Sequence, residues 1–221
     1  MLLDQSNIAP RLLDGDALIF DFDYQKWLRR YDNLTSNDIR LIAQNIKNEA
    51  LPCVEVYWRL TCEFDRFDFD SILASLHAQF LTHWRVTLLT STNLSARLAS
   101  YISKAISADS RISLRTSVDD TKPTIQPVLL HALLIEGNGQ LAPHALYLFA
   151  LQVKAGIKLI YSDEDRVNLV GRYAPVFKPQ YSPELAKSAN YFGSLALVCN
   201  INLITANSIN DFISQKSSLA Q

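Results

Sequence analysis

Glycine is scarce in this chain, which has only six glycines among 221 residues. The G-x-G-x-x-G fingerprint is absent, and so is any other glycine-rich phosphate loop. The sequence therefore excludes the dinucleotide- and phosphate-binding proteins that depend on such loops. A G-x-S-x-G nucleophile elbow is also missing, and no other motif supports a Ser–His–Asp arrangement.

Cysteine and histidine are few and are poorly spaced for metal binding. Cys53, Cys62 and Cys199 show neither metal-ligand spacing nor the spacing of a disulfide framework. Two of them, Cys53 and Cys199, lie in apolar, strand-like runs, where we expect a reduced and buried thiol. The four histidines, His77, His83, His131 and His144, have no mutual spacing suited to a metal.

The chain also lacks long apolar runs and clusters of one charge sign. No uninterrupted apolar run approaches the ~18 residues that a membrane-spanning helix needs. The formal net charge is −1 and there is no Lys/Arg run, so the charge favours neither nucleic acid nor an anionic membrane as a partner. The first residues lack the basic and apolar regions of a signal peptide, which predicts a cytoplasmic protein and leaves peripheral association with the inner membrane open.

The composition, with 48% hydrophobic and 19% charged residues, is that of a globular protein with one α/β domain. We expect residues 1–51 to form a mainly helical N-terminal flank. Within this flank, residues 24–32 have helical spacing, and Thr35 with Asp38 predicts the capped start of a second helix. Residues 17–22 could add a strand.

From Pro52 onward, predicted strands alternate with predicted helices, which indicates a mostly parallel, doubly wound sheet. The expected strands are Val54–Leu60, Trp84–Leu89, Arg111–Arg115, Val128–Ile135 and Lys158–Tyr161. Between them we expect helices that begin at Asp70 and Asn93, and one that runs from Pro143 to Ala155. Ligands of such sheets bind beyond the carboxyl ends of the strands, at the point where the strand order reverses.

Residues 159–195 contain the densest set of signals. An apolar strand end delivers three consecutive acids, Asp163, Glu164 and Asp165, to the edge of the sheet. Gly171 interrupts an alternating pattern, which predicts a hairpin tip. Ser182, followed by proline and glutamate, predicts the start of a short helix.

The order of these motifs, I-Y-S-D-E-D, a glycine hairpin, F-K-P and then N-Y-F-G, resembles that of the family 2 glycosyltransferases that build bacterial O-antigen and other surface polysaccharides. The resemblance implies the GT-A fold, a Rossmann-like α/β sheet, for residues 52–221. It also implies a nucleotide sugar and a glycan acceptor as ligands, with Mn²⁺ or Mg²⁺ as the cofactor of an active member. A protein partner in a polysaccharide-synthesis assembly is a further expectation.

The turns that would hold the nucleotide depart from the family pattern. Thr90 and Ser91 stand where the family has an aspartate pair, and their hydroxyls could either bind a ribose or cap a helix. Glu136 and Asn138 stand at the metal-binding D-x-D turn, so the sequence predicts a weak metal site there, or a plain turn with none. The helix motif that follows, L-x-P-x-A-L-Y, is intact at residues 141–147.

Other parts of the pattern survive. Asp163, Glu164 and Asp165 are the candidates for a catalytic carboxylate, although they could instead pair with Arg166, Arg172 or Lys178 as scaffold. The further candidates for binding the nucleotide sugar are Lys178, Asn190 and Tyr191. The segment before residue 136 is shorter than in the family, and residues 200–221 contain no acidic D-Y-D-L-type segment to supply the acceptor-side base.

Two hypotheses follow from these departures. The first is a catalytically weak or silent glycosyltransferase-like domain that supports an active partner or domain. The second is an active transferase in which Glu136 and Asn138 hold the sugar nucleotide with an atypical metal site or without a metal.

Overall fold

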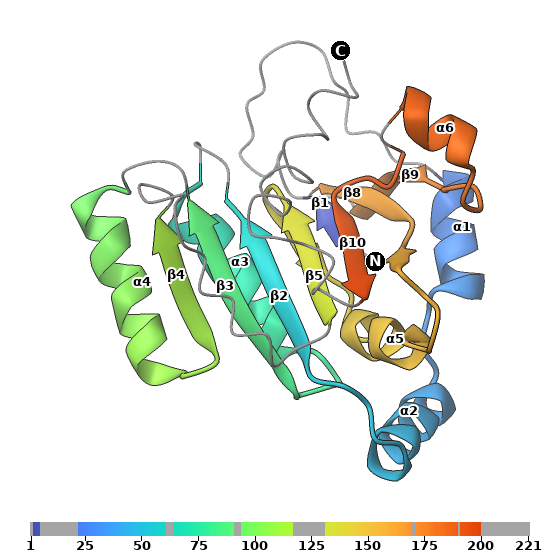
Figure 1. Ribbon diagram of the computed structural model, residues 1–221, viewed down its shortest axis with the longest axis horizontal. Helices are drawn as coiled ribbons and strands as arrows, with labels where there is room; N and C mark the ends of the chain where they lie inside the picture. Colours follow the sequence, from blue (N-terminus) through green and yellow to red (C-terminus); the bar gives the residue numbers. More distant parts are fainter. Residues whose placement is uncertain are drawn as a thin grey trace.

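The computed structural model describes residues 2–4, 22–60, 64–90, 94–116, 131–168, 171–189 and 191–199. These residues form a mixed α/β fold around a six-stranded sheet of strand order β4-β3-β2-β5-β10-β7 (Figure 1). Four neighbouring strands are parallel: β4 (Ile112–Thr116), β3 (Trp84–Thr90), β2 (Val54–Arg59) and β5 (His131–Glu136). The predicted mostly parallel sheet flanked by helices is confirmed.

One strand of this sheet runs against the others. The strand β10 (Leu195–Cys199) is antiparallel both to β5 and to β7 (Leu159–Tyr161) and lies between them. The sequence marked Cys199 as strand-like, but this insertion joins residues more than thirty positions apart. It places β7, the strand that precedes the acidic residues 163–165, one strand away from β5.

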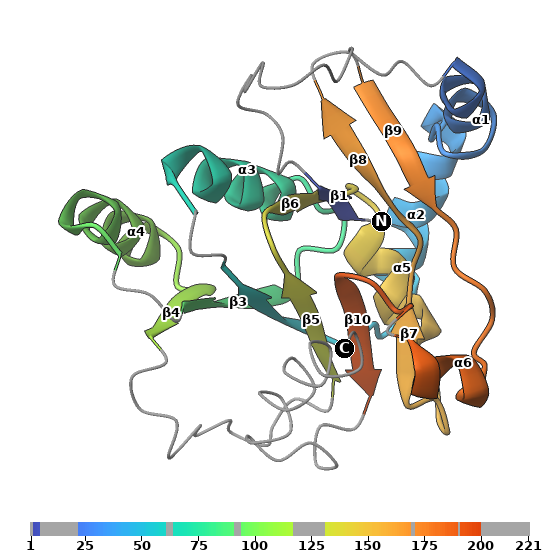
Figure 2. The same ribbon diagram turned by 90° about the horizontal axis from the view of Figure 1, so that it is seen from above.

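The helices α3 (Arg66–His77), α4 (Ala96–Ala108) and α5 (Ala145–Gln152) lie on the same face of the sheet in both views (Figures 1 and 2). Their apolar side chains share one core with the alternate residues of the strands, including Trp58, Leu88 and Leu133. A doubly wound sheet carries helices on both faces. In the described part of the chain, these three helices cover one face of the sheet.

Within the N-terminal flank, the described residues 22–48 are mainly helical, as predicted. It contains α1 (Phe22–Tyr31) and α2 (Ser36–Asn48). Thr35 caps α2 in a capping box with Asp38, as the sequence indicated. Asn45 on α2 donates a hydrogen bond of 3.0 Å to the Tyr147 hydroxyl on α5, which ties the flank to the core. The predicted strand at residues 17–22 lies outside the described residues except for Phe22, which begins α1.

A second, smaller sheet has the order β6-β1-β8-β9. The hairpin β8 (Glu164–Asn168) and β9 (Gly171–Val176) is antiparallel, which confirms the turn predicted at Gly171. The other two strands, β1 (Leu2–Asp4) and β6 (Gly139–Leu141), were not predicted. α1 packs against β9, and α6 (Pro183–Ser188) follows the hairpin with Ser182 as its cap.

Three helix boundaries predicted from the sequence were wrong. Helix α3 is capped by Asp65 rather than Asp70, because Asp65 and Asp68 form a reciprocal capping box one turn earlier. Helix α4 is capped by Ser95, whose hydroxyl accepts from the Leu98 amide, rather than by Asn93. Helix α5 ends at Gln152, short of Ala155.

The position of the α3 cap is testable by substitution. Asp65→Ala removes the side chain that accepts the Asp68 amide, so we expect a loss of about 1 kcal/mol in the free energy of unfolding. Asp70→Ala is the matched control, because its exposed carboxylate contacts Arg66 and Tyr101 at the surface and does not cap the helix. Urea unfolding measures both variants, and a larger loss for Asp70→Ala would contradict the assignment.

Candidate functional site

The strand order reverses between β2 and β5, because the chain moves from β2 outward to β3 and β4 and then returns to the other side of β2. Arg59 is the last residue of β2 and Glu136 is the last residue of β5, and the two are paired in register. Open α/β sheets bind their ligands at such a point, beyond the carboxyl ends of the strands. The candidate site is therefore centred on Arg59 and Glu136.

The turn after β5 has a fixed backbone. Gly137 adopts a φ of 89°, which favours glycine, and its amide donates to the Arg59 carbonyl at 3.1 Å. Its carbonyl in turn accepts from the indole nitrogen of the buried Trp58 at 2.8 Å. This geometry determines the directions in which Glu136 and Asn138 leave the turn.

Both side chains of the turn contact other side chains of the protein. A Glu136 carboxylate oxygen lies 3.7 Å from the Arg59 guanidinium, and both side chains are about two-fifths exposed, at 42% and 41%. The Asn138 amide nitrogen donates to the Asp68 carboxylate on α3 at 2.9 Å. Burial raises the pKa of the Asp68 carboxyl.

These residues do not fit a divalent cation of the Mn²⁺ or Mg²⁺ type. Such cations prefer several oxygen ligands with carboxylate charge. Here the Glu136 carboxylate faces a guanidinium, and Asn138 directs its N–H donor rather than its oxygen toward the nearest carboxylate. Over the described ranges there is no group of three or more His, Cys, Asp and Glu side chains that could hold a metal.

The other predicted nucleotide turn is only partly visible. Thr90 ends β3 at the same edge of the sheet and is 2% exposed, so it presents almost no surface to a ligand. Ser91 lies outside the described residues, and so does Asn190.

Of the three acids after β7, two contact Lys178 and the third contacts Arg172. An Asp163 oxygen accepts from the Lys178 amide at 2.8 Å. A Glu164 oxygen accepts from the Ser194 amide at 3.0 Å and lies 3.5 Å from the Lys178 ammonium. Asp165, whose side chain is fully buried, accepts from the Arg172 guanidinium at 2.6 Å. These three side chains therefore do not converge on one site.

Lys178 is a structural cation in this arrangement. Its side chain is 2% exposed, and its ammonium donates to the Phe192 carbonyl at 2.7 Å as well as pairing with Glu164. Burial lowers the pKa of Lys178, while Glu164 opposes that shift. Lys178 thus joins the end of the hairpin to the turn before β10.

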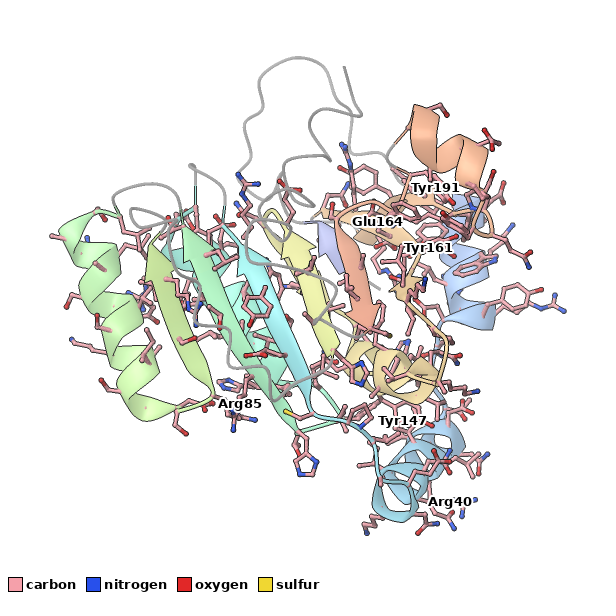
Figure 3. The ribbon with its side chains drawn as sticks, in the orientation of Figure 1. Arg40, Arg85, Tyr147, Tyr161, Glu164 and Tyr191 are labelled. Carbon is pink, nitrogen blue, oxygen red and sulfur yellow. The ribbon has the colours of Figure 1, made fainter. Side chains whose placement is uncertain are left out.

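Tyr191 belongs to an aromatic cluster beside α6. Its ring lies 5.9 Å from that of Tyr161 and 4.6 Å from that of Phe192, and its hydroxyl accepts from the Ser182 amide at 2.9 Å. Figure 3 shows Tyr161, Glu164 and Tyr191 grouped at this corner of the molecule. The hydroxyl of Tyr191 completes the start of α6 and is used within the protein.

Sequence reasoning missed the partners that define this region. Asp68 gave no signal, since its contact with Asn138 joins residues 70 positions apart. Arg59 stood one residue before the end of a predicted strand, and the rule about carboxyl ends could have identified it.

The turn before β10 requires glycine at position 193. Gly193 has a φ of 71°, and a Cβ there would collide with the Lys178 ammonium and a Glu164 carboxylate oxygen. Gly193→Ala should therefore lower the free energy of unfolding by about 2 kcal/mol or more, combining backbone strain with displacement of the buried ion pair. Thermal and urea unfolding measure this loss.

Gly156→Ala is the matched control for that substitution. Gly156 has a similar φ of 87°, but a Cβ there meets nothing within 4 Å. The control should show only the backbone cost of about 1 kcal/mol. Equal losses at both positions would contradict the role of Gly193 as the space for the Lys178–Glu164 pair.

Part of this chain is similar in sequence to a protein of O-antigen biosynthesis. An alignment over 129 positions, which covers 54% of this chain, shows 32% identity to the O-antigen biosynthesis protein RfbC of Myxococcus xanthus. The match covers 10% of that protein, so the chain spans about a tenth of this relative. No family model matches the chain. Among solved structures, the chain is similar to the mannosyltransferase PcManGT of Pyrobaculum calidifontis in complex with GDP-Man and Mn²⁺. The TM-score is 0.40 and the identity 11%, and the match covers 73% of this chain and 52% of that one.

Proposed function

We propose that this chain is a glycosyltransferase-like domain of bacterial cell-surface polysaccharide synthesis that is catalytically weak or silent and supports an active partner or domain. The similarity to a segment of an O-antigen biosynthesis protein supports the proposed role in polysaccharide synthesis. The mostly parallel sheet with a ligand position at its switch point is compatible with a nucleotide-sugar domain. We further propose that residues 52–221 form this domain, that 1–51 are its flank, and that it acts in the cytoplasm.

The observation that carries the proposed loss of catalysis is the occupation of the switch-point turn by contacts within the protein. Glu136 pairs with Arg59 and Asn138 with Asp68, so the two positions expected to hold a metal instead connect β2, β5 and α3. The three surviving acids are likewise directed at Lys178, Ser194 and Arg172. A catalytic base that takes a proton from an acceptor needs an unobstructed approach to that hydroxyl, and it contributes typically 10²–10⁴-fold.

One feature favours the second hypothesis, a transferase that works without a metal. The Arg59 guanidinium stands at the switch point, and a guanidinium can bind a phosphate through two parallel hydrogen bonds. A nucleoside diphosphate could replace Glu136 as its partner. Stabilisation of the fold by a nucleoside diphosphate in the presence of EDTA, lost in Arg59→Gln, would support this second candidate.

Turnover is the direct test of the proposal. The protein, incubated with a panel of nucleotide sugars and Mn²⁺ or Mg²⁺, should release nucleoside diphosphate only at the background rate. Turnover that depends on the metal and disappears in Glu136→Gln would overturn the silent-domain assignment. The Glu136→Gln variant serves to exclude a contaminating transferase.

Rebuilding the acidic turn should destabilise the fold rather than restore a site. Asn138→Asp places a second carboxylate against Asp68, where an amide now donates a hydrogen bond of 2.9 Å. We expect a loss of about 1–3 kcal/mol in the free energy of unfolding at pH 7. Both carboxyl pKa values should be raised in the folded state, so the loss should shrink as the pH falls and the pair takes up a proton.

The compensating change is Asp68→Asn in the same chain. It removes one of the two facing carboxylates, so part of the lost stability should return in urea unfolding. The recovery should be partial, because the Asp68 oxygen that contacts residue 138 also accepts from the Asp65 amide, and an NH2 group in its place could not. A single Asn138→Asp variant as stable as the original protein at pH 7 would show that Asp68 does not constrain this turn. The turn would then be open to repair by substitution.

A further inference from the structure

Exposed aromatic side chains gather on α1 and at the end of β9. Phe22, Trp27 and Tyr31 on α1 are 57%, 36% and 64% exposed, and Val176 and Phe177 are 50% and 54% exposed. The ring centroid of Trp27 lies 5.2 Å from that of Phe177 and 5.6 Å from that of Tyr31, so these three rings are continuous across the two elements. We call these five side chains the α1–β9 patch.

Basic side chains stand among these aromatic rings. Lys26, Arg29 and Arg30 are exposed on α1, against the single acid Asp23 within the same helix. The Lys26 ammonium lies 4.6 Å from the centre of the Phe22 ring, and the Arg30 guanidinium lies 5.4 Å from that of Tyr31. The chain as a whole has a net charge of −1, so this positive charge is a local property that the overall composition conceals.

Buried side chains of α1, beside the patch, hold the helix in place. Tyr24 and Leu28 are buried, and the Tyr24 hydroxyl donates to the buried Asp165 at 2.5 Å. The Gln25 side chain donates to the Arg172 carbonyl on β9. The patch is therefore preformed on a fixed helix, and a partner would not have to order it first.

We propose that the α1–β9 patch binds the surface of an anionic lipid membrane, with α1 lying in the plane of the interface. Tryptophan and tyrosine favour the boundary between lipid and water, where an apolar ring and a polar group are both accommodated. Exposed Lys and Arg are attracted to anionic headgroups, and a fixed amphipathic helix with both features is typical of interfacial binding. No described helix is long and apolar enough to cross a membrane, so the association would be with the surface. This proposed membrane binding does not depend on whether the domain transfers sugars.

Trp27 provides an internal reporter for the test. Of the three tryptophans, Trp58 and Trp84 are 0% and 2% exposed, so a change in the environment of the exposed Trp27 dominates any fluorescence change on binding. Vesicles of phosphatidylcholine mixed with phosphatidylglycerol should shift the emission to the blue, and brominated lipid should quench it. Vesicles of phosphatidylcholine alone should produce a smaller change, and high salt should weaken the binding to the mixed vesicles.

Charge reversal distinguishes binding through the α1–β9 patch from a general electrostatic attraction of the protein to anionic vesicles. Arg29→Glu with Arg30→Glu should reduce partitioning into the mixed vesicles by about 30-fold or more, since each basic residue contributes roughly fivefold. The matched control reverses Arg40 and Lys47, two exposed basic residues on α2 (Arg40 is labelled in Figure 3). The control should bind as the original protein does, because α2 does not carry the aromatic side chains of the patch.

Co-flotation with vesicles measures the aromatic contribution without relying on fluorescence. Trp27→Ala with Phe177→Ser should bind the mixed vesicles at least tenfold more weakly while still unfolding cooperatively in urea, at a lower midpoint because both rings also pack against Tyr24. Absence of binding to the mixed vesicles would overturn the proposal, and so would an equal loss in the α2 control. Protection of α1 from hydrogen exchange by a polysaccharide or a protein, with none by vesicles, would identify a different partner and also overturn it.

Discussion

A fully buried carboxylate, that of Asp165, constrains how the rest of this structure is arranged. A charge in that environment is strongly unfavourable unless it is paired and hydrogen-bonded. The Arg172 guanidinium lies at 2.6 Å and the Tyr24 hydroxyl at 2.5 Å, and the same guanidinium contacts Asp32 at 2.5 Å. Burial raises the pKa of Asp165, while the hydrogen bonds from Tyr24 and Arg172 lower it. Both partners contact Oδ2, whereas the buried Oδ1 accepts no hydrogen bond from the described residues. The partners of this one oxygen thus join α1, the segment after it, and the β8–β9 hairpin.

This constraint affects the chemistry available at the neighbouring acids. With Asp165 fixed inward, Asp163 accepts the Lys178 amide and Glu164 accepts the Ser194 amide, so the acidic segment fastens the hairpin to the turn before β10. At the switch point, the Glu136 and Asn138 side chains contact Arg59 and Asp68 in the same way. Charged groups that would serve a ligand in a transferase here serve the fold, which supports the proposal of a weak or silent domain.

The sequence predicted the elements whose signals are local. Strand β2 and the hairpin at Gly171 followed from alternation and a glycine, and the Thr35 capping box was read correctly from four residues. The cap of α3 was placed wrongly, because residues 65–70 contain three aspartates and only the folded chain shows which one precedes the helix. Strand β10 was noticed as apolar, but its antiparallel place between β5 and β7 depends on pairing across the whole domain.

The site was predicted less well than the fold, for a related reason. The sequence placed Glu136 in the turn directly after a strand ending at Ile135, and in the structure Glu136 is the last residue of that strand. The sequence also raised the pairing of the acidic segment with Arg172 and Lys178, which the structure shows. It could not show that Asn138 faces Asp68, since nothing in either local pattern indicates the contact. Tertiary structure determines the partners of a charged side chain. Here those partners indicate that the side chains stabilise the fold rather than bind a ligand.

The substitution Arg172→Met tests this account most directly. It leaves Asp165 and Asp32 buried without their shared cation, so the free energy of unfolding at pH 7 should fall by about 3 kcal/mol or more. Adding Asp165→Asn to that variant should recover part of the loss, because one of the two uncompensated charges is removed. An Arg172→Met protein within about 0.5 kcal/mol of the original in urea unfolding would contradict the account. The acidic segment would then not be committed to the fold, and its carboxylates would be available to a substrate.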